Sequence, residues 1–184
     1  MRKDFGAKTY LYPMPVLIIA TYGPDGTPDA MNAAWGGICD ENKIAVCLSA
    51  EHKTTKNILA RKAFTVSVAD AAHVDACDYV GIVSGNKVQD KFEKAGFHAV
   101  KSKFVDAPVI EELPMALECR LEGVQGELII GEIVNVSADE SVLGEDGKID
   151  AAKVRPITFD PVHHKYIALG DTVGNAFKDG AKLK

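Results

Sequence analysis

Residues 43–69 read KIAVCLSAEHKTTKNILARKAFTVSVA and contain two strand patterns separated by one helix pattern. In Lys43–Ser49, larger apolar side chains alternate with smaller ones, which is typical of a β-strand whose successive side chains face opposite sides. Phe64–Ala69 repeats this alternation, and Lys53–Lys62, between the two strands, carries apolar residues at helical spacing. The stretch therefore predicts a strand, a short helix and a second strand.

Strand patterns continue on both sides of this stretch, whereas helix patterns are few. Val16–Tyr22 is apolar and β-branched, and the turn residues Gly23–Gly26 predict a hairpin with a second strand near Pro28–Asn32. Further strands are predicted at Leu117–Glu122, with one buried and one solvent-facing side, at Glu127–Ser137 and at Tyr166–Leu169, and further helices at Ala71–Val80 and Lys87–Ala95. Many short strands with a few inserted helices and no regular β-α-β alternation predict a mainly β fold, built as a closed or partly closed barrel.

Length and charge define the broad class of the chain. Its 184 residues fit a single domain spanning residues 1–184, and 47% hydrophobic with 26% charged residues is typical of globular proteins. The 21 Lys and Arg against 26 Asp and Glu give a net charge of −5, which argues against nucleic acid or an anionic membrane as a partner. The longest apolar run, Val16–Ala20, is far shorter than the ~20 residues of a membrane span. Because Met1–Tyr12 lacks the apolar core of a signal peptide, we expect a cytoplasmic protein.

The sequence predicts no metal site and no catalytic pair of side chains. The four cysteines lie far apart, without a C-x-x-C pair or a histidine at ligand spacing, so buried thiols are the simplest interpretation. His163 and His164 are adjacent and would face opposite sides of a strand. The chain lacks G-x-G-x-x-G, and Gly81–Lys87 lacks the spacing of a P-loop, which excludes a Rossmann dinucleotide site and a P-loop NTPase.

The junction after Ser49 has the features of an anion site. A strand ends there and a helix begins near Thr54, so unpaired backbone N–H groups point outward at the start of the helix. With the hydroxyls of Thr54 and Thr55, the charge of Lys53 and Asn57 nearby, the junction is a candidate for binding one phosphate. An ordinary capping threonine beside solvated lysines explains the same spacing, and the residues alone favour that second interpretation.

Two further segments are candidates for contacting a ring-shaped ligand or its charge. Asn32–Trp35 holds the chain's one tryptophan among small residues, so a flat ring could lie against this backbone while the Asn32 amide bonds the edge of the ring. A Trp35 side chain that fills the barrel core explains the segment equally well. Lys87 and Lys91 share the exposed side of the helix predicted there, and such a lysine run is more often a solvated face.

Taken in order along the chain, these segments resemble the flavin reductase-like FMN-binding split-barrel family, and most closely its flavoredoxin branch. The resemblance covers nearly the whole chain, and although each motif is short, the collinear set is specific. The motifs that carry it are Pro15-Val16, Asn32–Trp35, Lys53-Thr54 with Asn57-Ile58, Val83–Gly85, Asp90–Phe92, Ala107–Glu111, Leu117–Cys119, Arg155-Pro156, Tyr166–Gly170 and Gly174–Phe177. The chain departs from the family pattern at Leu113, where this branch often has a cysteine, and at His52 and Lys53, where Arg or Tyr is more usual.

The resemblance implies an FMN-binding split β-barrel that forms a homodimer, with flavin sites between the two barrels. It also implies an oxidoreductase that passes hydride or electrons from NAD(P)H through FMN to a flavin or protein acceptor. The alternative is an FMN electron carrier that is served by a redox protein partner and has no NAD(P)H activity of its own. The residues expected to hold FMN are Lys53, Thr54, Thr55, Ser49 and Asn57 at the phosphate, Asn32, Ala33, Ala34 and Trp35 along the ring, and Lys91, Lys87 and Ser84 beside them. Such chemistry requires no catalytic side chain, and none is predicted.

Overall fold

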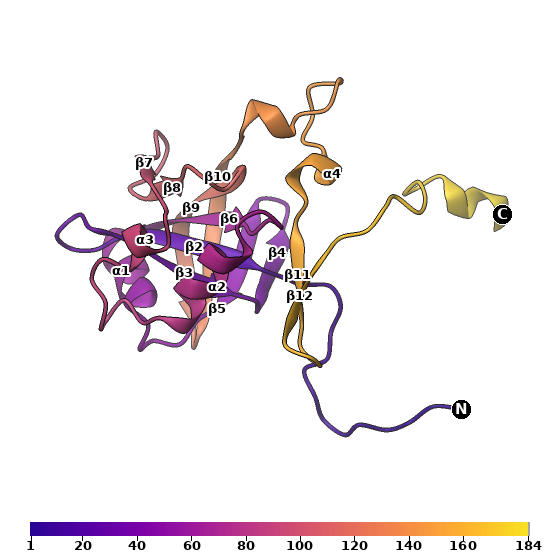
Figure 1. Cartoon of the computed structure of the whole chain (residues 1–184), viewed down its shortest axis with the longest axis horizontal. Coiled ribbons are helices and arrows are strands. Elements are labelled where there is room, and N and C mark those ends of the chain that lie inside the picture. Colours follow the sequence, from indigo (N-terminus) through magenta and orange to yellow (C-terminus); the bar gives the residue numbers. More distant parts are fainter. Residues whose placement is uncertain (184) are drawn as a thin grey trace.

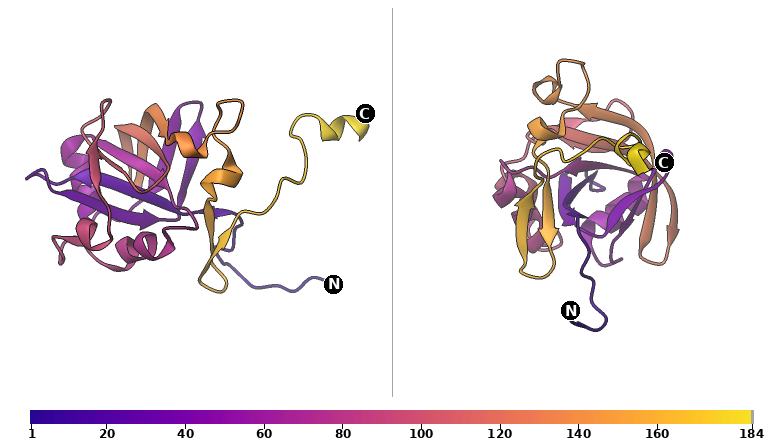
Figure 2. Two further views of the ribbon diagram at one scale, coloured as in Figure 1. Left: turned by 45° about the horizontal axis from the view of Figure 1, so that its top comes forward. Right: turned by 90° about the vertical axis from the view of Figure 1, so that its right-hand side faces the viewer.

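Seven antiparallel strands form the main sheet of the protein, whose computed structural model describes residues 1–183 (Figure 1). In order across the sheet, the strands are β3 (Pro28–Ala33), β2 (Leu17–Tyr22), β6 (Ala63–Val68), β9 (Met115–Gln125), β10 (Leu128–Ala138), β5 (Lys43–Cys47) and β4 (Gly36–Asp40). The sheet is curled, and its two edge strands β3 and β4 are consecutive in the chain, joined by Ala34 and Trp35 (Figure 2). The expected mainly β, partly closed barrel is confirmed.

Smaller elements pack around this sheet. A three-stranded sheet contains β1 (Met14–Pro15), β11 (Ile157–Asp160) and β12 (Lys165–Ala168), and a two-stranded sheet contains β7 (Ala99–Lys101) and β8 (Pro108–Ile110). The helices are α1 (Lys53–Arg61), α2 (Val74–Ile82), α3 (Lys91–Lys94) and α4 (Ala151–Val154), with 3-10 helices η1 (Glu140–Val142) and η2 (Asp179–Leu183). Within residues 1–183, no helix has the length and apolar character needed to cross a membrane.

Two apolar clusters lie on opposite faces of the curled sheet. One contains Ile19, Val46 and Phe64, and the other contains Ile18 and Phe92 together with side chains from α2. Ile18 and Ile19 belong to different clusters because successive side chains of a strand face opposite sides. Burial on both faces explains why β2 is a continuous apolar run in the sequence.

Most strands form where the sequence predicts them, including the hairpin of β2 and β3 and the strands on either side of α1. The sequence pattern does not predict β4, because Gly36–Asp40 begins with two glycines and is mostly exposed. The solvent-facing side predicted for β9 is found at Arg120 and Glu122, which are exposed, but the prediction is wrong at Glu118. Glu118 is only 3% exposed, and its carboxylate accepts hydrogen bonds from the side chains of Ser102 and Asn135. Partners from distant parts of the chain therefore allow a charged residue to be buried there.

Both predicted middle helices change their boundaries in the structure. The helix expected at Lys87–Ala95 is reduced to α3, because the preceding residues form a turn in which two backbone N–H groups donate to the Ser84 carbonyl. The helix expected at Ala71–Val80 begins later, at Val74, because the Asp70 carboxylate accepts the backbone N–H groups of the two residues before it. Local side-chain and turn hydrogen bonds thus compete with the helix at each start.

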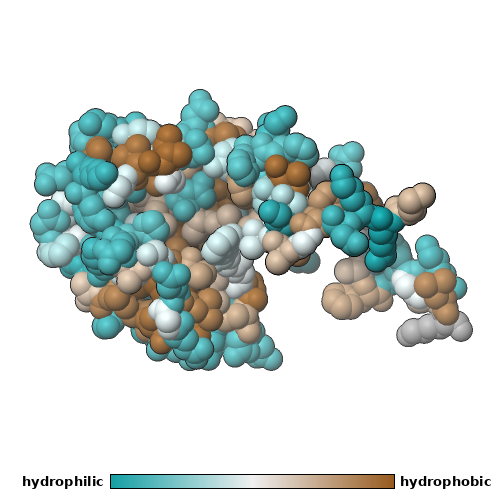
Figure 3. Space-filling view, turned by 90° about the horizontal axis from the view of Figure 1, so that it is seen from below, coloured by the Kyte–Doolittle hydropathy of each residue, from teal (hydrophilic) through white to brown (hydrophobic). Residues whose placement is uncertain are grey.

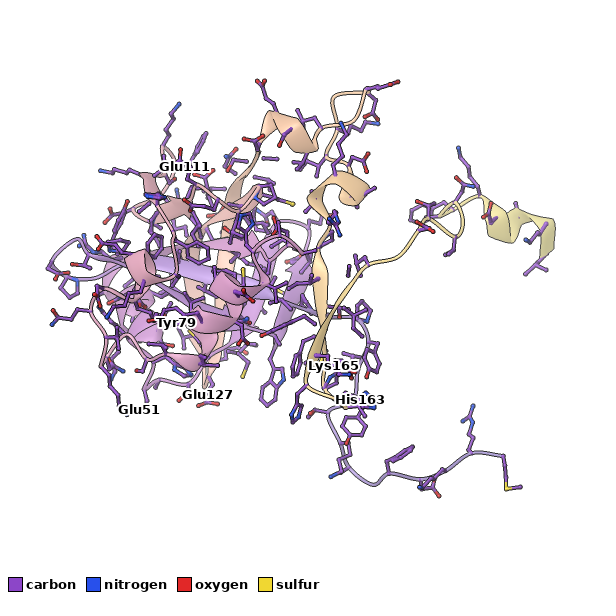
Figure 4. The ribbon with its side chains drawn as sticks, in the orientation of Figure 1. Glu51, Tyr79, Glu111, Glu127, His163 and Lys165 are labelled. Atoms are coloured by element: carbon purple, nitrogen blue, oxygen red, sulfur yellow. The ribbon has the colours of Figure 1, made fainter. Side chains whose placement is uncertain are left out.

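Two exposed arms extend from the body, one at each end of the chain (Figures 1 and 2). The N-terminal arm, residues 1–12, is fastened at its inner end, where the Tyr12 hydroxyl donates to the Asp160 carboxylate on β11. His163, in the turn between β11 and β12, places its Nδ1 2.8 Å from the same carboxylate (Figure 4). The C-terminal arm, residues 170–183, follows β12 and leads away from the sheet.

Candidate functional site

A small cavity of about 120 Å³ lies at the start of helix α1. Its walls come from β3, from the start of α1, from the end of α2 with the segment that follows it, and from the first residue of α3. The lining residues are Met31, His52, Lys53, Thr54, Val80, Gly81, Ile82, Val83, Ser84, Gly85 and Lys91. The structure therefore gathers four of the predicted residues, Lys53, Thr54, Ser84 and Lys91, around one cavity.

The first turn of α1 is suited to binding an anion. The helix has nine residues, its N-cap residue His52 makes no side-chain capping hydrogen bond, and no acidic residue lies in the first turn. The first backbone N–H groups of a helix have no partner within the helix, and the helix dipole adds a partial positive charge at this end. A phosphate oxygen at this position would satisfy these donors, and Lys53 adds a full positive charge.

Gly85 allows the segment after α2 to approach this helix end closely. A Cβ atom at position 85 would lie 2.3 Å from Oδ1 of Asp29 and 3.0 Å from Cδ of Lys53. Carbon atoms do not approach these atoms so closely, so any larger residue would push the segment away from the cavity. Ser84, the preceding residue, is exposed at the rim of the cavity.

A buried carboxylate lies directly behind the cavity. Asp29 is 2% exposed on β3, and the Thr54 hydroxyl donates to its Oδ2 at 2.6 Å. A hydroxyl has one hydrogen to donate, so in this arrangement the Thr54 side chain has none left for a phosphate oxygen. The backbone N–H of Thr54, in the first turn of α1, remains oriented as a helix-start donor.

Lys91 is buried against the same carboxylate. Its Nζ lies 3.6 Å from Oδ1 of Asp29, and it also donates to the carbonyl oxygens of Val80 and Val83, at 3.3 and 3.2 Å, at the end of α2. Burial lowers the pKa of Lys91, while the nearby Asp29 carboxylate acts to raise it. The prediction that the lysines of this segment form a solvated face is therefore wrong for Lys91, which joins α2, α3 and β3 from the inside.

Four other predicted residues, Ser49, Thr55, Asn57 and Lys87, lie outside the cavity lining. The Thr55 hydroxyl donates to the backbone carbonyl of Ser49 at 2.8 Å, and the Asn57 amide donates to the Thr21 hydroxyl at 3.1 Å. Thr55 and Asn57 are both buried. Lys87 is exposed on the turn before α3. The contacts of Thr55 and Asn57 thus hold α1 against the sheet.

Asn32 lies further along β3, between the cavity and the edge of the barrel. Its Nδ2 donates to the Cys77 carbonyl at 3.1 Å and lies 3.5 Å from the Tyr166 hydroxyl, which donates to Asp78 at 2.7 Å. Burial and then the bond to Asp78 raise the pKa of Tyr166. Among residues 1–183, no donor reaches the Asn32 Oδ1 within hydrogen-bond distance. The amide therefore has its acceptor oxygen free for a ligand.

Trp35 follows β3 and is 58% exposed, so the interpretation that it fills the barrel core is wrong. Ala33 is buried, and Ala34 is half-buried. Trp35 and Ala34 line a groove of about 640 Å³, here called the Trp35 groove, between the N-terminal arm and the barrel. Its residues are Lys8, Thr9, Tyr10, Leu11, Pro13, Met14, Pro15, Ala34, Trp35, Gly36, Gly37, Ile38, Ala45, Cys47 and Leu128. β3 thus runs from the cavity, past Asn32, to this groove.

The sequence does not indicate Asp29 and Tyr166 as parts of this region. Asp29 follows Pro28 in a segment rich in turn residues, so its burial beside Thr54 and Lys91 has no local signal. Tyr166 comes from β12, far along the chain, and approaches Asn32 only through the three-stranded sheet. A charged residue inside a strand is the one clue that could have found Asp29, since buried charges require partners.

Comparisons with known proteins agree with this architecture. The family model described as "Flavin reductase like domain" matches residues 9–160. The structure of flavoredoxin from Desulfovibrio vulgaris (Miyazaki F) has a TM-score of 0.94 and 42% identity, and the match covers 98% of this chain and 100% of that chain. Flavoredoxin from Methanosarcina acetivorans has a TM-score of 0.88 and 26% identity, with 100% of both chains covered. An FMN-binding domain of a flavin reductase-like enzyme from Shewanella baltica OS155 shares the fold, with a TM-score of 0.78, 22% identity and 88% of each chain covered.

The family match and the structural matches support each other. The family model spans most of the chain, from the N-terminal arm to the end of β11. The two flavoredoxins align over their whole length, which confirms the resemblance that the sequence motifs indicate. This chain therefore belongs to the family of flavin reductase-like domains.

Proposed function

We propose that the protein binds FMN and passes hydride or electrons from NAD(P)H through it to a flavin or protein acceptor, working as a homodimer. The observation that carries this proposal is the uncapped start of α1, which faces a cavity that Gly85 also lines. Strand β3 leads from this cavity past Asn32 to Trp35. Family membership and the similarity to two flavoredoxins support FMN as the ligand. Bound FMN would supply both hydride and single-electron transfer.

The residues around the cavity fit a phosphate monoester. The backbone N–H groups of the first turn of α1 and the Lys53 ammonium would hold its oxygens, with Ser84 at the rim. Thr54 and Lys91 would support the site indirectly, because both contact the buried Asp29 carboxylate and so fix β3 against α1 and α2. In this arrangement the two side chains position the site and leave direct contact with phosphate to the backbone.

The residues along β3 fit the edge of an isoalloxazine ring. The free Oδ1 of Asn32 would accept a hydrogen bond from a ring N–H, since Cys77 and Tyr166 already hold its amide nitrogen. The exposed Trp35 side chain would cover an apolar part of the ring and exclude water from it.

The same site fits a second function, an FMN electron carrier without NAD(P)H activity of its own. Holding FMN at these residues requires no separate nicotinamide site, so the two functions differ only in the electron donor. The test is an anaerobic titration of the FMN-loaded protein with NADH and with NADPH, followed by visible absorbance. Bleaching supports the nicotinamide-dependent oxidoreductase. A yellow protein that neither nucleotide bleaches supports the carrier, and a protein that binds no added FMN overturns both.

A substitution at Gly85 tests the phosphate site itself. Gly85→Ala should weaken FMN binding by about tenfold or more, because displacement of the segment loses at least one hydrogen bond to a charged group, worth ~1.5–3 kcal/mol. The matched control is Gly123→Ala on β9, where an added Cβ meets nothing within 4 Å. Thermal unfolding of both variants separates lost affinity from lost folding. Equal FMN affinity in Gly85→Ala and the wild-type protein would contradict the placement.

A further inference from the structure

The chain exposes more surface than a compact monomer of its size. Its accessible surface is 11424 Å², whereas a compact monomer of 19.7 kDa is expected to expose about 8,600 Å², so the excess is about 2,800 Å². Stable, permanent dimers bury about 2,000–5,000 Å² in total. Burial of only half the excess on each of two copies would reach that range.

The C-terminal arm accounts for part of this excess. Val173 and Phe177 are fully exposed, at 101% and 107%, and every described residue of the arm is exposed. The last backbone hydrogen bond to the body is from the N–H of Leu169 to the carbonyl of Pro156. Beyond it, the hydrogen bonds of residues 170–183 join residues within the arm, for example the N–H of Asn175 to the Asp179 carboxylate at 2.8 Å. So few contacts with the body do not offset the conformational entropy that is lost when the segment is ordered.

The Trp35 groove is an exposed apolar surface, which suits the apolar side chains of the arm. Trp35, Ile38 and Leu128 are 58%, 65% and 36% exposed, and the inner end of the N-terminal arm forms the opposite wall. Exposed apolar patches of this kind on a protein surface mark sites of protein contact. Figure 3 shows apolar surface open on the body, and it shows the arms standing apart from it.

We propose that two copies of this chain exchange their C-terminal arms, so that the arm of each copy lies in the Trp35 groove of the other and buries Val173 and Phe177 there. The structure directs the arm away from its own barrel after β12, which favours the groove of a second copy over its own (Figures 1 and 2). Because the groove adjoins Asn32, each arm closes the ring end of the other copy's FMN site. The inference builds on the homodimer in the proposed function and adds the segment that completes each site.

The first test measures assembly in protein without FMN. Sedimentation of the wild-type chain should show a dimer, and the double variant Val173→Ser/Phe177→Ser should dissociate at least tenfold more readily. Val100→Ser is the matched control, because Val100 is 48% exposed on the separate β7–β8 sheet. Trp35, the one tryptophan of the chain, adds a local signal: its emission should shift to longer wavelength only in the double variant. Unchanged dimerisation and unchanged emission in the double variant would overturn the proposal.

The second test identifies the chain to which the arm belongs. Phe177→Cys, treated with a short bismaleimide, should join to the exposed Cys39, which neighbours the groove residue Ile38, and give a covalent dimer on a denaturing gel. Both proteins carry Cys47→Ser as well, because Cys47 is half-buried and also lines the groove; in this background Phe177→Cys/Cys39→Ser should give no such dimer. A link within one chain would overturn arm exchange, as would the absence of any link. Neither test uses FMN, so a protein that passes both and binds no FMN would contradict the proposed function alone.

Discussion

Replacing Asp29 by asparagine tests whether the buried ion pair behind the cavity holds the site together. The Lys91 Nζ lies 3.6 Å from Oδ1 of Asp29, and the two side chains are 4% and 2% exposed. Asparagine has nearly the same shape and keeps an oxygen for the Thr54 hydroxyl, so the main change is the loss of the negative charge. Lys91 would then be a buried cation whose remaining partners are the Val80 and Val83 carbonyls.

Breaking a buried pair by removing one partner costs about 3–5 kcal/mol, because the remaining charge stays desolvated. We therefore expect Asp29→Asn to lower the free energy of unfolding by about 3–5 kcal/mol in urea denaturation at pH 7. The double variant Asp29→Asn/Lys91→Met should lose less than the sum of the two single variants. Asp106→Asn is the control: its pair with Arg61, at 3.2 Å, is half exposed and should contribute about 1 kcal/mol or less.

The pH dependence gives this prediction a definite sign. Burial lowers the pKa of Lys91, and Asp29 opposes that effect, so Asp29→Asn should lower this pKa further. A lysine whose pKa is lower in the folded state binds fewer protons there, so its contribution to stability increases as pH rises toward the ordinary lysine pKa. The deficit of Asp29→Asn relative to wild type should therefore shrink between pH 7 and pH 10. A deficit under about 1 kcal/mol, or one that grows with pH, would refute the reasoning.

Two further predictions concern the barrel core and its thiols. A Cβ at Gly131 would lie 2.4 Å from Cζ of Phe64, so Gly131→Ala should lower the free energy of unfolding by about 1–3 kcal/mol, and adding Phe64→Leu should recover part of that loss. Burial raises the pKa of Cys77 and of Cys119 to about 12, so Ellman's reagent at pH 8 should label the exposed Cys39 and reach these two only after unfolding. Rapid labelling of either buried thiol in the folded protein would show that its cluster opens readily.

The parts of the fold that the sequence predicts are those set by local patterns. The hairpin of β2 and β3 forms because turn residues separate two strand patterns, and α1 forms because apolar residues recur at helical spacing. Local patterns do not predict β4, because its two leading glycines and its exposed residues give no alternation of apolar and polar side chains. It forms as an edge strand by pairing with β5. The burial of Glu118 also depends on Ser102 and Asn135, whose positions come from the fold as a whole.

The candidate site shows the same division between local and distant information. The helix start at Lys53 is predictable, because a strand ends just before it and the spacing of the helix is clear. The role of Thr54 is not, because its hydroxyl bonds Asp29, 25 residues away. The same carboxylate turns Lys91 from a solvated lysine into a buried one. A single unpredicted residue therefore changes the function of two predicted ones.

The charge around the cavity also bears on how FMN would be held. Asp29 and Lys91 offset each other, so the net positive charge available to a ligand comes from Lys53 and from the start of α1, which adds about half an elementary charge. A phosphate monoester carries about −1.5 to −2 charges at pH 7, so these groups, with about +1.5 in all, leave no excess of positive charge over it. The phosphate would then supply only part of the affinity, and the rest would come from ring contacts at Asn32 and Trp35. Because a copy without its partner's arm leaves Trp35 exposed, FMN affinity and dimer formation should be coupled, each strengthening the other.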